Sequence, residues 1–97
     1  MITLKGYGIS ITVDSRQITV KADTKMTKTA YDAEQIVIPY ERIVKTVMKK
    51  GGIFTTHRIH VNFIGENDNE RKIVLYFIPI FQKEAFDDLS HILSQYR

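Results

Sequence analysis

Hydrophobic and polar residues alternate along much of the chain with the two-residue period of β-strands. Ile9, Ile11 and Val13 alternate with polar residues, and after a short turn at 14–16 the segment 17–22 repeats the pattern. Successive side chains of a strand point to opposite faces, so each run predicts a strand with one buried face. Two such runs joined by a short polar turn predict an antiparallel hairpin.

The middle of the chain is less regular. Segment 23–34 is polar and rich in Thr and Lys, which predicts a long loop with one short turn around 30–33. Segment 35–38 is a short apolar run that stops at Pro39, and proline cannot donate to a strand ladder. We therefore expect a short strand that ends at this proline.

A turn at 39–42 leads into the next apolar run. Segment 43–50 is rich in Val, Ile and Thr, which favours a strand ending before the two glycines that follow it. A helix over 40–50 is the alternative, because some of the same apolar residues share one helical face.

The second half contains a second predicted hairpin. Segment 57–64 alternates apolar and polar residues, 65–70 is rich in turn-forming residues, and 71–78 supplies the partner strand. This last strand is apolar on both faces. The face expected to point to the interior carries Ile73, Leu75 and Phe77. The opposite face carries Val74, Tyr76 and Ile78, and must be covered by the rest of the chain, be covered by a second chain, or stay exposed. We predict that this second set is a partner interface.

The C-terminal segment 82–97 has the spacing of an amphipathic helix. Its apolar positions are Phe86, Leu89, Ile92, Leu93 and Tyr96. A helix of this length is marginal in water by itself, so its apolar face must be buried against the strands. The fold class expected over residues 1–97 is therefore mainly β (α+β), a single domain. It is expected to form an antiparallel barrel or sandwich of six to seven strands, capped by one C-terminal helix.

Three phrases of the sequence, together with this order of elements, resemble a known family. They are I-S-I-T-V-D-S-R-Q-I-T-V (9–20), I-V-I-P-Y-E-R-I-V-K-T-V (36–47) and F-Q-K-E-A-F-D-D-L-S-H-I-L (81–93). They are similar to the bacterial, GRAM-related branch of pleckstrin-homology-like small β-barrel domains. The resemblance implies a capped barrel that acts as a binding module. It implies no lipid site, because the chain has no tryptophan in its last helix and only Arg16 and Lys21 flank the first hairpin turn.

Composition narrows the function classes further. The chain has 97 residues, a hydrophobic fraction of 43% and no cysteine, so disulfides and thiolate chemistry are excluded. The longest apolar run is too short to span a bilayer, and the N-terminus lacks the pattern of a secretory signal. We therefore expect a cytoplasmic location.

The net charge is +3, and most of the excess of basic residues lies in the first half. If 43–50 and 57–64 are neighbouring strands, their cations gather near one loop. This candidate anion patch consists of Lys45, Lys49, Lys50 and Arg58. It suits a phosphate-rich ligand or an anionic membrane surface. The alternative is a solubilising strand edge, since exposed lysines also discourage edge pairing.

Motifs for catalysis are absent from the sequence. It contains no nucleophile elbow, P-loop or dinucleotide fingerprint. His57 and His60 fall on opposite faces of a strand, and we interpret both as exposed strand residues. The acidic loop around Asp68 lacks the central glycine and the bidentate glutamate of a calcium loop. We expect no enzyme activity, no catalytic or metal residues and no cofactor.

Two hypotheses of function follow, with a small hydrolase or ligand-binding barrel as a distant third. The first is a non-catalytic interaction or scaffold module that binds a protein partner or forms a homo-oligomer. The alternative is an anion-binding module for phosphorylated lipid or nucleic acid.

Overall fold

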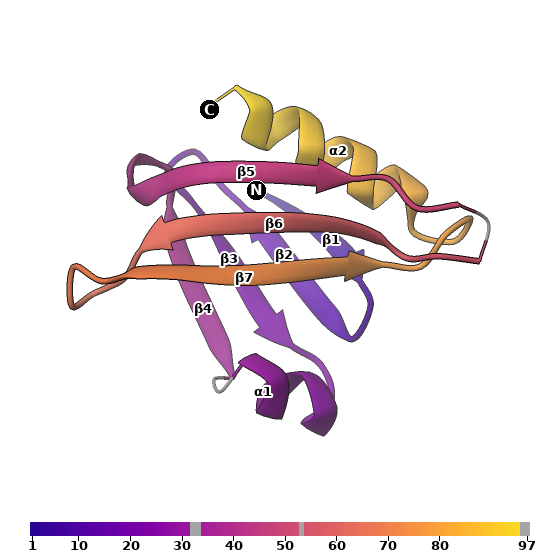
Figure 1. The fold of residues 1–97 in the computed structure, drawn as a ribbon, viewed down its shortest axis with the longest axis horizontal. Coiled ribbons are helices and arrows are strands. Elements are labelled where there is room, and N and C mark those ends of the chain that lie inside the picture. Colours follow the sequence, from indigo (N-terminus) through magenta and orange to yellow (C-terminus); the bar gives the residue numbers. More distant parts are fainter. Residues whose placement is uncertain (32–33, 53, 96–97) are drawn as a thin grey trace.

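Two antiparallel sheets and a C-terminal helix form the architecture (Figure 1). The computed structural model describes residues 1–31, 34–52 and 54–95. The strands are β1 (Ile2–Gly6), β2 (Ile9–Val13), β3 (Gln17–Ala22), β4 (Gln35–Pro39), β5 (Ile43–Lys49), β6 (His57–Ile64) and β7 (Glu70–Phe77). The helices are α1 (Lys25–Tyr31), the short 3-10 helix η1 (Tyr40–Arg42) and α2 (Lys83–Ser94).

The first sheet has the order β1-β2-β3-β4. The predicted hairpin of β2 and β3 is confirmed, with Ile11 opposite Val20. Strand β1 was not predicted. Ile2 and Leu4 alternate with Thr3 and Lys5, but the run is short and Leu4 is its one large buried side chain. The strand is defined by its pairing with β2, in which Leu4 lies opposite Ile11.

The second sheet has the order β5-β6-β7. The predicted hairpin of β6 and β7 is confirmed, and β5 is a strand paired with β6, so the helical alternative over 40–50 is wrong. The β-branched side chains of this run fit a pleated surface better than a helix. An irregularity between Ile43 and Lys45 shifts the register at the start of β5.

The structure of segment 23–34 differs from the prediction. The predicted long loop is wrong, because α1 occupies Lys25–Tyr31; of the turn expected around 30–33, residues 32–33 lie outside the described residues. The carbonyl of Thr24 accepts the first helical hydrogen bond, from the N–H of Lys28 (3.0 Å), and Thr is favoured at that position. The helix contacts β3, so tertiary packing supports a segment whose polar sequence gives little helical signal.

Helix α2 packs on strands of both sheets. The predicted stripe is confirmed for Phe86, Leu89 and Leu93, which are buried, and for Ile92, which is half-buried; Tyr96 lies outside the described residues. Burying these three side chains is worth roughly 5–9 kcal/mol before entropy, comparable to the net stability of a small domain. The helix is therefore part of the core.

The two sheets meet at one corner, where the N–H of Tyr7 donates to the carbonyl of Tyr76 (2.7 Å). The seven strands of the described residues form two separate ladders and no continuous closed barrel. One core cluster includes buried residues from both sheets and from α2. Neither α-helix in the described part of the chain is long and apolar enough to cross a membrane.

Candidate binding surfaces

The outer face of the β5–β7 sheet is the most distinctive surface of the molecule. The strand register aligns its residues in three rows, Lys45–Asn62–Lys72, Val47–His60–Val74 and Lys49–Arg58–Tyr76. We call these nine residues the basic face. Four of them are Lys or Arg and none is acidic. The sheet carrying this face lies in front of the first sheet in Figure 1, and both helices are drawn to its sides.

The structure brings together most of the predicted anion patch. Lys49 lies directly opposite Arg58, and Lys45 is on the same face of β5. Lys50 is exposed but follows the end of β5, outside the ladder. Lys72 was missed by the sequence analysis. It has the same alternation phase as Tyr76, so extending that phase back along the strand would have identified it.

The predicted partner interface lies largely on this same surface. Tyr76 is 40% exposed and lies opposite Arg58, while Val74 is half-buried beside His60. Ile78 is half-buried beyond the end of β7, and its N–H donates to Oε1 of Gln82 (2.8 Å). The interior phase is confirmed: Ile73, Leu75 and Phe77 are all buried. The two surfaces predicted separately from the sequence therefore coincide.

His60 occupies the centre of the basic face. Partial burial, followed by the positive charges of Lys72, Lys49 and Arg58, lowers the pKa of His60 from its ordinary value of 6.5. The imidazole is therefore neutral at pH 7. Two atoms here, Nε of Arg58 and Nε2 of His60, are shielded from solvent and have no hydrogen-bond partner among the described residues.

His57 lies on the opposite face of the same strand, as the spacing predicts, but the expectation that it is exposed is wrong. It is buried, its Nδ1 accepts a hydrogen bond from the N–H of Gly51 (2.8 Å), and its ring centroid is 4.9 Å from that of Phe86. The signal was present in the sequence, because His57 has the same alternation phase as the buried Ile59, Val61 and Phe63. This histidine connects the β5–β6 loop to α2.

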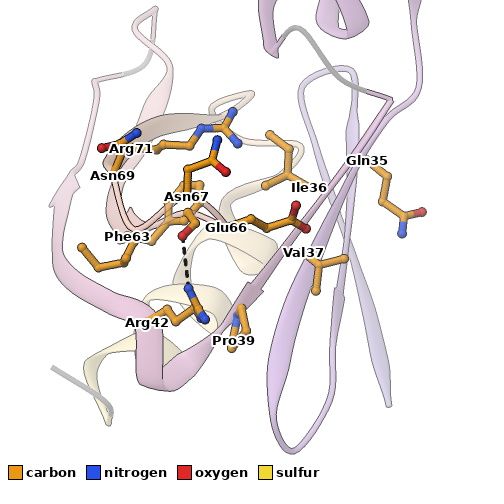
Figure 2. Close-up of a pocket in the computed structure, with 12 residues that line it drawn as sticks. Gln35, Ile36, Val37, Pro39, Arg42, Phe63, Glu66, Asn67, Asn69 and Arg71 are labelled. Atoms are coloured by element: carbon orange, nitrogen blue, oxygen red, sulfur yellow. Dashed lines mark hydrogen bonds between the residues drawn. The ribbon is translucent and has the colours of Figure 1, made fainter.

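A crevice of about 680 Å³ separates β4 from the β6–β7 hairpin (Figure 2). Both of its arginines already make contacts: Nη1 of Arg42 donates to the carbonyl of Gly65 (3.1 Å), and the guanidinium of Arg71 lies 5.6 Å from the ring centroid of Phe63. The first contact holds the hairpin loop to η1, and the second joins paired residues of β6 and β7. Sequence reasoning missed the crevice, because its walls come from distant segments.

The β6–β7 hairpin ends in an acidic tip, which we call the acidic hairpin: Glu66, Asp68 and Glu70. All three side chains are exposed. Backbone hydrogen bonds from the N–H of Asp68 to the carbonyl of Gly65 (3.0 Å) and from the N–H of Gly65 to the carbonyl of Asn69 (2.9 Å) fix the loop. Asp68 has φ of 61°, a left-handed conformation that Asp tolerates better than most residues.

No family model, curated protein or solved structure matches the chain. Among the described residues, no group of three or more His, Asp or Glu side chains is arranged to hold a metal ion.

Proposed function

We propose that the chain is a non-catalytic binding module of pleckstrin-homology-like fold, and that it docks a carboxylate-rich polypeptide on the basic face. The observation that carries the proposal is the register of β5–β7, which gathers four cations around His60 with no acidic residue among the nine positions. The electric field of such a cluster of cations attracts anionic partners and repels cationic ones.

The proposed fold rests on the order of the elements. Seven antiparallel strands, with α1 inserted between β3 and β4, are followed by one amphipathic helix that packs on both sheets, and the strands followed by a packed C-terminal helix agree with the family resemblance. The two-sheet sandwich supports this proposal.

The basic face favours a polypeptide over other anions. Its middle row is largely apolar, with Val47 and Val74 on either side of His60. A polypeptide supplies apolar side chains for this row and carboxylates for the cations on both sides, whereas a phosphate backbone supplies only charge. Binding of single-stranded nucleic acid uses several stacked rings, and among the nine positions only Tyr76 and the half-buried His60 carry a ring.

Titration of a fluorescein-labelled poly-glutamate peptide, followed by fluorescence anisotropy, tests the proposal. We expect salt-dependent binding that weakens about tenfold or more, or at least about 1.4 kcal/mol, in the double variant Lys49→Glu/Arg58→Glu. The matched control is Arg16→Glu/Lys25→Glu, which makes the same change of net charge at exposed positions outside the basic face.

Two results would overturn the proposal. The first is equal loss of affinity in the two double variants, which would mean that only net charge matters. The second is tighter binding of a thymidine oligonucleotide or of phosphatidylserine vesicles than of poly-glutamate, with the same dependence on Lys49 and Arg58. That result would support the phosphate-binding alternative instead.

A further inference from the structure

We infer that the carboxylate-rich partner is a second copy of this chain, whose acidic hairpin binds the basic face of the first. The inference rests on the proposed function, since it needs the basic face to accept carboxylates. It adds the identity of the bound partner, because the chain itself carries the carboxylates that the basic face would bind.

The acidic hairpin has the form of a ligand for that face. Its carboxylates at Glu66, Asp68 and Glu70 are exposed on a loop that backbone hydrogen bonds hold in one shape. A preorganised loop loses less conformational entropy on binding than a flexible acidic tail does. Among the described residues, the ion pairs are Lys5–Asp23, Lys28–Glu34 and Lys83–Asp87, so the hairpin and the basic face have formed none.

Glu70, the hairpin carboxylate that lies within β7, is on the same side of the sheet as the basic face, whereas Glu66 lines the crevice beside β4 (Figure 2). Glu70 shares the alternation phase of Lys72, Val74 and Tyr76 on β7. At about 3.3 Å per residue, Glu70 is about 20 Å from Tyr76 along the strand. Glu70 is therefore too far from the Lys49–Arg58 row to neutralise it within one copy, while Lys72 lies two residues from Glu70 on the same face.

Two copies related by a two-fold axis make this contact twice. Stacking the sheet faces with their strands antiparallel places the acidic end of each copy over the basic end of the other. Stacking without this reversal would place cations against cations, which is destabilising.

The basic face carries no carboxylate of its own that could pair with Arg58. A carboxylate from the hairpin of the second copy supplies an acceptor for this guanidinium, whose geometry suits bidentate pairing. Charge and hydrogen bonding therefore point to the same occupant.

Sedimentation equilibrium with paired charge reversals tests the inference. One variant reverses the face (Lys49→Glu/Arg58→Glu), and the other reverses the hairpin (Glu66→Lys/Glu70→Lys). Asp68 is left unchanged because its φ of 61° disfavours a lysine. We expect the unmodified chain to form a dimer that dissociates as salt rises, and each variant alone to dimerise at least about tenfold more weakly.

Mixing provides the decisive measurement. An equimolar mixture of the two variants restores the complementary pairing and should give a heterodimer at low salt, and the chain carrying all four substitutions should dimerise again. A monomeric wild-type chain at millimolar concentration and low salt, or a mixture that stays monomeric, would overturn the inference.

The poly-glutamate titration separates this failure from failure of the proposed function. If the wild-type chain stays monomeric but binds the peptide through Lys49 and Arg58, the self-association is wrong and the proposed function stands. If it also fails to bind the peptide, both are wrong. The hairpin-reversed variant keeps the basic face, so its binding of the peptide also shows that it is folded.

Discussion

The two faces of the β5–β7 sheet are built from the same three strands and differ in what holds their residues in place. On the inner face, Leu75 and Phe77 are fully buried and their positions follow from the hydrophobic effect. On the outer face, Lys49, Arg58 and Tyr76 are neighbours only because the strand register aligns them. The inner face therefore determines stability, and the outer face is available for binding.

Neighbouring aromatic residues on β7 give the sharpest test of this difference. Phe77 is fully buried and packs edge-on against Phe86 at a centroid distance of 5.7 Å. The variant Phe77→Ala should lower the free energy of unfolding by about 3–5 kcal/mol. Tyr76 is 40% exposed. The variant Tyr76→Ala should lower the free energy of unfolding by about 1 kcal/mol or less. Urea denaturation measures both, and equal losses would contradict the assignment of the two faces.

The two histidines of β6 repeat the comparison at smaller scale. His57→Ala removes the acceptor for the N–H of Gly51 and the ring contact with Phe86, and should lower the free energy of unfolding by about 2–3 kcal/mol. The matched variant His60→Ala should change it by less than about 1 kcal/mol. If His60→Ala were the more destabilising of the two, the outer face would have a structural role that we have not assigned to it.

The dependence of stability on pH should give the smallest effect. The pKa of His60 is lowered in the folded chain, so the unfolded chain binds more protons as pH falls from about 6.5, and stability is lost over that range. His60→Gln should remove this part of the pH dependence. Added salt should weaken it, because part of the shift comes from Lys72, Lys49 and Arg58. Identical pH profiles for the wild-type chain and His60→Gln would contradict this account.

Alternation was sufficient to predict the inner face and most of the elements. The buried phase of β7, the two hairpins and the buried stripe at Phe86, Leu89 and Leu93 all follow from the spacing of apolar residues. Strand β1 and helix α1 do not follow from spacing, because each is held mainly by contacts with a neighbouring element.

The arrangement of residues on the outer face is a second feature that the sequence alone does not predict. Alternation assigns Lys49, Arg58, Lys72 and Tyr76 to faces of their own strands, but it does not say which residue lies opposite which. That depends on the loops between strands and on the irregularity at the start of β5. The two surfaces predicted separately therefore became one only when the register was known. The burial of His57 could have been predicted from its phase in β6, but its ring contact with Phe86 could not, because α2 lies far away in the sequence.

The separation of charge along one sheet face also has a kinetic consequence. A molecule with carboxylates at one end of a surface and cations at the other has an electric dipole moment along that surface. During a diffusional encounter, the field of a charged partner rotates such a molecule before contact, which raises the fraction of collisions that are productive. In the self-association that we propose, the association rate constant should therefore depend on ionic strength more steeply than the dissociation rate constant does.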